Sequence, residues 1–426
     1  MAEVLDSDQS FIPARGRDYC RGCSGKSLFS ALNLGELPIA NELQQTQIIE
    51  IEKFPLHLKI CKDCGLGQVA DVVTPERIFR NYRYLSSMSS TFLAHAEQLV
   101  TYLVKNGLVG TQDWVLEIAS NDGYLLRNFA PFGISVLGIE PAKNIGERAI
   151  AQGIETITEF FSNDLASRLR LERGSPKIII ANNVMAHVPN LMDFLVGLKT
   201  LCDSETKIIV ENPTLVGILR DMQFDTIYHE HYSYLSVTSV YTLCKKLGLK
   251  LVKVEALEIH GGSNRYWIEI ESSETREDPS VQIALRSEKE KNIFSEETWQ
   301  YYANSVKDIL QQFESWLENK EKEGKRVYGY GAAAKASTLL NAIEVRPSQI
   351  LAIADISNEK QNRFMPPNGM RIISPEELFK ANPSDIVIFP WNIEIEIYKE
   401  LRKHFNSQVR FWSAIPFLHE VINNDT

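Results

Sequence analysis

The sequence predicts an α/β protein in which two doubly wound domains follow a small module that carries cysteines. Three observations lead to this fold class. Short apolar segments alternate with helical patterns between residues 114 and 211, the same alternation returns after residue 326, and four cysteines fall in pairs before residue 65. Because strands that alternate with helices form a parallel sheet covered on both faces, each alternating stretch predicts one such domain.

Composition agrees with this organisation and excludes several classes of protein. The 426 residues exceed what one core usually holds, so two to three domains are expected. A net charge of -10 argues against a nucleic-acid-binding surface. The first ten residues include three acids, and no window approaches the roughly 18 apolar residues of a membrane span. We therefore expect a cytoplasmic protein, in which the isolated Cys202 and Cys244 are buried and reduced.

The N-terminal module, residues 1–75, contains two C-x2-C pairs, Cys20/Cys23 and Cys61/Cys64. Each pair can place two thiolates on one turn, and two such turns complete the tetrahedral S4 shell that Zn²⁺ prefers at structural sites. A redox-active pair and scattered core cysteines are the alternatives, but neither explains two pairs with the same spacing. The sequence therefore predicts a structural zinc site.

The central domain is expected to span residues 76–270 and to begin with a helical lead-in, residues 76–105. A charged stretch, residues 271–325, has helical spacing from Ile293 and ends at Gly324, which predicts a connecting helix. The C-terminal domain is expected to span residues 326–426. The predicted buried strands are residues 114–119, 136–140, 178–181 and 207–211 in the central domain, and 326–330, 350–355 and 386–390 in the C-terminal domain.

The first strand of the central domain ends in a turn that suits a cofactor. The run Glu117-Ile-Ala119-Ser-Asn121-Asp122-Gly123 closes the strand and opens a helix, where backbone amides can face a ligand. The next strand ends at Glu140, whose carboxylate can accept both hydroxyls of a ribose.

This turn lacks the three glycines of a dinucleotide fingerprint, which disfavours NAD. It resembles motif I of the S-adenosylmethionine (SAM) methyltransferases, with Ala119 where a glycine is typical, so we expect the alanine methyl to narrow the approach of the methionine group. Phe160 and Asn182 are expected beside the adenine. An α/β core without a cofactor is the alternative.

Three polar clusters follow candidate strands: residues 182–189, 224–232 and 260–266. They hold half of the eight histidines of the chain. Histidine titrates near neutral pH, which suits proton abstraction beside a carbonyl group. Metal ligation by His229 and His231 is the weaker alternative. Histidines with only a packing role remain the other alternative.

Taken in order, these segments resemble the sugar C-methyltransferases that act at C-3 of a nucleotide-linked 4-keto-deoxysugar. The resemblance covers nearly the whole chain. It rests on the two C-x2-C pairs, Tyr-x-Tyr-x-Ser-Ser at 82–87, Asn-Asp-Gly at 121–123, His-x-Pro at 187–189, Tyr-x-Glu-His at 228–231 and His-Gly-Gly at 260–262. In the C-terminal domain it continues with Gly-Tyr-Gly-Ala-Ala-Ala-Lys at 329–335, residues 355–363, and Phe-Pro-Trp-Asn at 389–392.

The resemblance implies a reaction and a set of residue roles. A base removes the C-3 proton beside the 4-ketone, and the resulting enediolate takes the methyl group of SAM. By similarity His231 is the base, Glu230 orients and polarises it, Tyr228 positions the cofactor, and Tyr82 and His187 line the sugar site. The cofactor residues are Glu117, Ala119, Asn121, Asp122, Gly123, Glu140, Phe160 and Asn182.

Similarity also assigns binding of the nucleotide-linked sugar to the C-terminal domain and to the cleft before it. The expected substrate residues are Tyr84, His260, Gly261, Gly262, Asn264, Arg265, Tyr330, Lys335, Asp355, Lys360, Asn362, Trp391 and Asn392. No nucleic-acid or membrane partner is expected, and the protein is expected to be a monomer or a weak homo-oligomer. Two alternatives stay open: methylation of a different small carbonyl-activated or hydroxyl substrate, and a non-catalytic zinc-containing scaffold that binds a nucleotide sugar.

Overall fold

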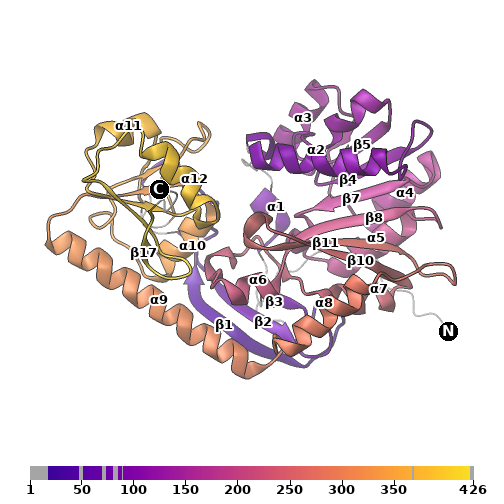
Figure 1. Cartoon of the computed structure of the whole chain (residues 1–426), viewed down its shortest axis with the longest axis horizontal. Helices are drawn as coiled ribbons and strands as arrows, with labels where there is room; N and C mark the ends of the chain where they lie inside the picture. The colour runs from indigo at the N-terminus through magenta and orange to yellow at the C-terminus, as the bar shows by residue number, and fades with distance from the viewer. Residues whose placement is uncertain are drawn as a thin grey trace.

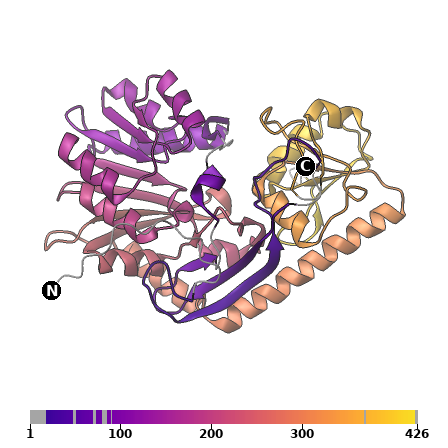
Figure 2. The same cartoon turned by 180° about the vertical axis from the view of Figure 1, so that it is seen from behind.

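The computed structural model describes residues 18–47, 51–69, 73–79, 85–88, 90–366 and 369–422 of the chain. Two lobes lie side by side, one built around a seven-stranded sheet and the other around a six-stranded sheet (Figure 1). The long hairpin of strands β1 (Leu28–Leu37) and β2 (Phe54–Cys61) reaches between the lobes, as Figure 2 shows from behind. Helix α9 (Glu296–Lys322) runs from this hairpin to the C-terminal lobe.

The N-terminal module is an antiparallel sheet in which β2 lies between β1 and β3 (Gly67–Val69). Its fourth strand comes from far along the chain, because β9 (Ser233–Tyr234) pairs with β3. Residues 228–234, which we call the histidine segment, therefore end inside the sheet of the cysteine-bearing module. Every second side chain of β2 is fully buried, as a half-buried strand requires, namely Leu56, Leu58 and Ile60.

The central sheet has the strand order β10-β11-β8-β7-β4-β5-β6. Its strands are parallel except for β11, which is antiparallel to both of its neighbours. The four predicted strands are β4, β5, β7 and β8, each within two residues of its expected bounds. The bounds are β4 (Trp114–Ile118), β5 (Ser135–Ile139), β6 (Thr156–Ile157), β7 (Ile178–Asn182), β8 (Lys207–Pro213), β10 (Leu249–Leu257) and β11 (Ser263–Ile270).

Helices cover both faces of this sheet, which makes it doubly wound as predicted. Neighbouring residues of β4 enter different cores: Val115 packs with α2 (Ser90–Lys105), and Leu116 packs with the helices of the opposite face. Four of the helices begin after a side chain that accepts a hydrogen bond from the first turn, which stabilises the helix start. The remaining helices are α3 (Lys143–Ala151), α4 (Asn163–Arg173), α5 (Leu191–Leu201), α6 (Leu215–Arg220) and α7 (Val237–Lys246).

The C-terminal lobe is a second α/β unit with the strand order β14-β13-β12-β15-β16-β17. Its strands are parallel except for β17. The three strands predicted here lie at β12, β13 and β15. The bounds are β12 (Val327–Tyr330), β13 (Ile353–Ala354), β14 (Ile372–Ile373), β15 (Asp385–Ile388), β16 (Arg410–Ser413), β17 (His419–Glu420), α10 (Ala334–Ala342), α11 (Pro375–Lys380) and α12 (Glu394–Leu401).

The stretch between the lobes holds two helices, α8 (Pro279–Glu290) and α9, where the sequence predicted one. Helix α8 begins at Pro279, and Asp278 accepts a hydrogen bond from its first turn, a start signal that the prediction overlooked. Helix α9 buries one stripe of side chains at helical spacing, namely Trp299, Tyr302, Val306, Ile309, Phe313 and Leu317.

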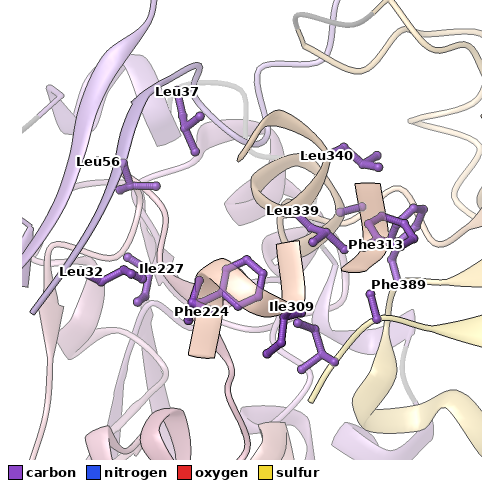
Figure 3. Close-up of a cluster of buried hydrophobic side chains, with 14 of the residues drawn as sticks. Leu32, Leu37, Leu56, Phe224, Ile227, Ile309, Phe313, Leu339, Leu340 and Phe389 are labelled. Atoms are coloured by element: carbon purple, nitrogen blue, oxygen red, sulfur yellow. The ribbon is translucent and has the colours of Figure 1, made fainter. Parts of the chain in front are cut away.

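One hydrophobic core joins three parts of the chain (Figure 3). The N-terminal hairpin contributes Leu32, Leu37 and Leu56 to it. Phe224 and Ile227 enter it just before the histidine segment. Helix α9 and the C-terminal lobe contribute Ile309, Phe313, Leu339, Leu340 and Phe389, among others. Because this core is shared, the N-terminal module, the histidine segment and the C-terminal lobe are held in contact.

Candidate active site

Four thiols from the two C-x2-C pairs meet at one point. The sulfur atoms of Cys20, Cys23, Cys61 and Cys64 all lie within 4.8 Å of one another. The Sγ–Sγ separations Cys20–Cys64 and Cys23–Cys61 are both 3.6 Å. A tetrahedron with Zn–S bonds of about 2.3 Å has edges of about 3.8 Å. The four thiolates therefore fit a closed Zn²⁺ site that leaves no ligand position for a substrate. Cys202 and Cys244 are buried elsewhere as free thiols, as predicted.

The first cysteine pair is tied to strand β3. The backbone N–H of Arg21, between the two cysteines, donates to Gln68 Oε1 at 2.8 Å, and its guanidinium donates to Val69 O at 3.0 Å. The thiol groups also accept backbone hydrogen bonds, from Gly22 N and Gly25 N at 3.4 Å. Such bonds orient metal-binding thiolates and stabilise their charge. A folded zinc site therefore holds the strand on which the histidine segment pairs.

The turn after β4 has an unusual backbone. Ala119, Asn121 and Gly123 have φ angles of 57°, 50° and 78°, all in the left-handed region. For alanine this conformation costs about 1 kcal/mol, and it explains why a glycine is typical at position 119 of the SAM motif. Asn121 Oδ1 accepts from Ser86 N at 2.9 Å, which fastens the turn to the lead-in.

Three carboxyl groups lie buried at this turn. Within the described residues, Glu117 Oε2 and Asp122 Oδ1 have no hydrogen-bond partner. Burial and then the nearby carboxylates raise the pKa of Glu117 well above its usual range. Burial likewise raises the pKa of Glu140 to about 7, although Ala142 N and Asn121 N both donate to this carboxylate. Buried acceptors that lack donors suit a ligand that brings an ammonium group and hydroxyls, as SAM does.

The affinity for S-adenosylhomocysteine is expected to fall when the pH drops below 7. Ribose hydroxyls donate best to ionised Glu140, and its pKa of about 7 means that acid protonates it. The dissociation constant should increase up to about tenfold per pH unit below 7 and level off above pH 8. Isothermal titration calorimetry from pH 5.5 to 8.5 measures this, with Glu140→Gln as the variant that removes the dependence. Equal slopes for both proteins would contradict the assignment.

The other predicted cofactor residues reach the same edge of the sheet. Asn182 ends β7, next to β4 in the sheet, and its Oδ1 is buried without a partner in the part of the chain that the structure describes. Phe160 follows β6 and is 44% exposed, so its ring is open for stacking. Because parallel strands end at one edge, the turn after β4, Glu140 and Asn182 surround a common space.

The histidine segment and the turn after β7 bring two imidazoles together. The rings of His187 and His231 lie 4.7 Å apart between centroids, and Tyr228 lies 4.0 Å from His231. His231 Nδ1 is 2.9 Å from Thr226 O, and a carbonyl oxygen only accepts, so Nδ1 carries the proton. In the neutral form of the ring, the basic lone pair of His231 is therefore at Nε2. Burial lowers the pKa of His187 to about 4, so the His187 ring is neutral.

Among the described hydrogen bonds, none joins the Glu230 carboxylate to His231, which Glu230 is expected to orient and polarise. The described bond that orients the His231 ring comes from Thr226 O. Both carboxylate oxygens of Glu230 instead accept from Asn41 Nδ2, at 2.8 and 2.7 Å. The main-chain oxygen of Glu230 accepts from His187 Nδ1 at 2.8 Å. Burial raises the pKa of the Glu230 carboxyl group to about 7. Glu230 thus belongs to the cluster, but through its contacts with Asn41 and His187.

A contact between the lobes collects three predicted substrate residues. The ammonium group of Lys335 lies 4.0 Å from the Trp391 ring centroid and donates to Asn392 Oδ1 at 2.9 Å. Trp391 Nε1 donates across to Asp225 Oδ2 of the central lobe at 2.8 Å. Burial raises the pKa of Asp225 to about 6, and burial lowers the pKa of Lys335 to about 8. This cluster of opposite charges lies just before the histidine segment.

Gly261→Ala is expected to loosen this contact. Gly261 has a φ angle of 79°, which strains an alanine. A Cβ added to Gly261 would also lie 2.6 Å from the Trp391 ring and 2.7 Å from Gln223 Nε2. We expect a loss of at least about 2 kcal/mol of folding free energy, from backbone strain and steric overlap together. Gly107→Ala is the matched control, because it has φ 64° with open space around it. Urea denaturation of both variants measures the difference; equal losses would show that Trp391 does not pack there.

A second cluster of polar residues lies around the turn after β12. Asp355 Oδ2 accepts from Ala332 N at 2.9 Å, and Lys360 Nζ donates to Ala332 O at 2.9 Å. Lys360 also lies 3.3 Å from Asp355 Oδ2, and its charge acts on Glu230 of the other lobe. Tyr330 ends β12 beside this turn, while Asn362 Oδ1 accepts from Arg371. The structure thus brings Asp355 and Lys360 toward the histidine segment.

The remaining predicted substrate residues make contacts of other kinds or are not described. Arg265 is bonded to Glu211 Oε1 at 2.6 Å and to Glu255 Oε2 at 3.4 Å, so its guanidinium is committed within the sheet. Asn264 donates to Tyr266 OH at 3.4 Å on the same strand. Gly262 shares the tight turn of Gly261. Tyr82, Tyr84 and the side chain of His260 lie outside the described residues.

Three polar residues of this region were missed from the sequence. Asn41 contacts Glu230, and Asp225 contacts Trp391, as described above. Asn212, at the end of β8, is 1% exposed, and neither polar atom of its side chain has a partner among the described residues. Asp225 stood inside a cluster that the sequence singled out, but nothing in the sequence near Asn41 or Asn212 marks a site.

Comparison with known proteins agrees with this arrangement. Three family models match successive parts of the chain: "Putative zinc binding domain" at residues 20–79, "Methyltransferase domain" at 93–254 and "C-methyltransferase C-terminal domain" at 258–416. The C-methyltransferase NovU of Streptomyces niveus is 30% identical over 401 residues, which are 94% of this chain and 96% of NovU. The chain belongs to this family of C-methyltransferases.

This C-methyltransferase is therefore SAM-dependent, and its zinc-binding domain holds the four-cysteine cluster. The solved magnesium protoporphyrin IX methyltransferase (ChlM) of Synechocystis PCC 6803 covers 46% of this chain and 92% of its own, at 14% identity and a TM-score of 0.34. The PH0226 protein of Pyrococcus horikoshii covers 46% and 98%, at 16% identity and 0.36. Likeness at this level does not bear on function. Among the described helices, none is both long and apolar enough to cross a bilayer.

Proposed function

We propose that this C-methyltransferase transfers a methyl group to C-3 of a nucleotide-linked 4-keto-deoxysugar. The observation that carries the proposal is the His231 ring beside His187 and Tyr228, with Nδ1 bonded to Thr226 O so that Nε2 is left as the basic nitrogen of the neutral form. Methylation at carbon needs a carbon nucleophile, and a base beside a ketone generates one from an acidic C–H bond. A 4-keto-sugar has such a bond at C-3.

The residues of the site support a simple sequence of events. His231 Nε2 takes the C-3 proton, and the electron pair moves into the ketone to form an enediolate. When bound, SAM would supply the electrophilic methyl group, so that a C–C bond forms at C-3 as the S–CH3 bond breaks and S-adenosylhomocysteine leaves. His187 and Tyr228 hold the sugar and the cofactor against His231, and Tyr82 is proposed to join them. Alignment of the two carbons within about 3–3.5 Å supplies much of the remaining rate.

The C-terminal lobe is proposed to bind the nucleotide. The turn after β12 and the start of α10 present backbone N–H groups, and Lys335 and Lys360 carry positive charge nearby, which suits a diphosphate. Asp355, with one oxygen on Ala332 N and the other on Ser357 N, suits a ribose or a base edge. Trp391 offers a ring face, although Lys335 covers it here.

Hydrogen exchange at the sugar C-3 tests the reaction. The protein is incubated in D₂O with dTDP- or GDP-linked 4-keto-deoxysugars and S-adenosylhomocysteine, and C-3 deuteration is followed by NMR. The proposal is supported if C-3 exchanges its hydrogen only when the protein is present, and if the sugar is methylated once SAM replaces S-adenosylhomocysteine. Methylation of the sugar without exchange would place transfer on a hydroxyl group. Binding of S-adenosylhomocysteine without reaction on any keto-sugar would point to a different carbonyl substrate.

The domain roles follow the same proposal. Residues 1–75 bind zinc, 76–270 bind SAM, 271–325 connect and 326–426 bind the nucleotide sugar. The free thiols fit a cytoplasmic location. We further propose a monomer or weak homo-oligomer, which size-exclusion chromatography with light scattering tests directly.

A further inference from the structure

We propose that Asn41 of the zinc-binding module is a positioning residue of the reaction, which acts by holding the Glu230 carboxylate from both oxygens. This inference rests on the proposed function, since Glu230 precedes the proposed base His231. Asn41 follows strand β1 and lies 189 positions before Glu230, so the bond joins two distant parts of the chain. Nothing in the motifs of the sequence indicates this pairing.

The geometry makes Asn41 the principal partner of a buried acid. Glu230 is 2% exposed, and both of its carboxylate oxygens accept from one amide nitrogen, at 2.8 and 2.7 Å. Asn41 itself is exposed, so its side chain covers the carboxylate on the solvent side. A buried carboxylate without such donors favours its neutral form, because burial penalises charge. Asn41 therefore both fixes the orientation of Glu230 and favours its ionised state.

The effect of Asn41 reaches the imidazoles through the backbone. Glu230 O accepts from His187 Nδ1, and the next residue is His231. A Glu230 side chain that changed its rotamer would disturb this peptide group and with it both rings. The segment of Asn41 is held in turn by the C-terminal lobe, since Gln44, three residues on, pairs with Phe364 of that lobe through two backbone bonds of 3.0 and 2.9 Å.

The charged and titratable groups that face Glu230 come from several elements. Lys360 acts on it from the C-terminal lobe and favours its ionised form. Burial raises the pKa of Tyr232 in the histidine segment, Arg21 of the zinc module opposes that rise, and Glu230 adds to it. His187 bonds the main-chain oxygen of Glu230. With these groups unchanged, a substitution at position 41 alters the ionisation of Glu230 directly.

Asn41→Asp is the decisive variant, because it keeps the shape, removes the donor and adds a second carboxylate. We expect kcat at pH 7 to fall at least tenfold, and the acidic limb of the pH–rate profile to move up by one unit or more, since two adjacent carboxylates share a proton. Asn41→Gln keeps an amide donor and should recover part of the rate. Asn33→Asp, an exposed change of the same type in the same module, should leave the profile unmoved.

A second measurement needs no substrate and separates this proposal from the proposed function. The Tm of the wild type, Asn41→Asp, Glu230→Gln and the double variant is measured from pH 5.5 to 8.5. We expect Asn41→Asp to lower Tm by an amount that grows as the pH rises. In the Glu230→Gln background, the loss of Tm should no longer depend on pH. A pH-independent loss in both backgrounds, or a rate loss confined to KM, would overturn the positioning role. No turnover with any keto-sugar would count against the substrate alone.

Discussion

Replacing His231 by asparagine is expected to lower kcat by a factor of about 10²–10⁴, the usual contribution of a general base. The amide nitrogen of asparagine can still donate to Thr226 O, as His231 Nδ1 does at 2.9 Å, so the segment should keep its shape. What the variant lacks is a basic nitrogen in place of Nε2. Hydrogen exchange at C-3 should disappear together with methyl transfer, because both need the same proton removal.

The affinity for S-adenosylhomocysteine separates loss of the base from loss of the fold. It should stay within about twofold in His231→Asn, because the cofactor edge is formed by Glu117, Asp122 and Glu140, on other strands. His229→Asn is the matched control. His229 Nε2 bonds Phe54 O at 3.1 Å, a contact within the fold, so this variant should keep turnover of the same order. Wild-type turnover in His231→Asn would move the base to His187.

Removal of zinc is expected to have the second large effect. Structural zinc sites in small modules contribute on the order of 10 kcal/mol to folding, and the module here has little core of its own apart from the shared one. Cys20, Cys61 and Cys64 also pack in the core of the central lobe. Without zinc, strand β3 should lose its order, and the histidine segment should lose the strand on which it pairs.

Cys61→Ser and a zinc chelator provide the two measurements. Elemental analysis should find one zinc per chain in the wild type and markedly less in the variant. Methyl transfer should fall at least a hundredfold, with a lower Tm. Cys244→Ser is the matched control, since this buried cysteine is not one of the four clustered thiols and its replacement should leave the zinc content unchanged. Full activity of zinc-free protein would show that the histidine segment does not depend on the module.

Local patterns predicted most of the fold. Buried strands such as residues 178–181 and the start of α9 follow from apolar runs and periodicity, which depend on neighbours in the sequence. The cysteine spacing predicted the thiol cluster for the same reason. Strand β9 was not predictable in this way, because two residues carry no periodic signal and the pairing partner lies far away.

In the candidate site too, the local motifs could be predicted from the sequence and the tertiary contacts could not. The turn at Glu117 to Gly123 and the histidines could be recognised, since their residue types and spacing are local. The partners that hold them could not. Asn41 bonds Glu230 across the chain, Thr226 O orients His231 through its main chain, and Arg265 is committed to Glu211 on the neighbouring strand. Each of these contacts depends on tertiary structure, which spacing alone does not reveal.

The pairing of β3 with β9 has a consequence for synthesis on the ribosome. Val69 ends one strand and Ser233 begins its partner, so about 160 residues must be made between them. At roughly 5–20 residues per second this takes about 8–30 s. Throughout that interval the nascent module has zinc ligands and an unpaired strand edge, which is open to pairing with other chains. The yield of active protein should therefore depend on early binding of zinc and on chaperones that bind the growing chain.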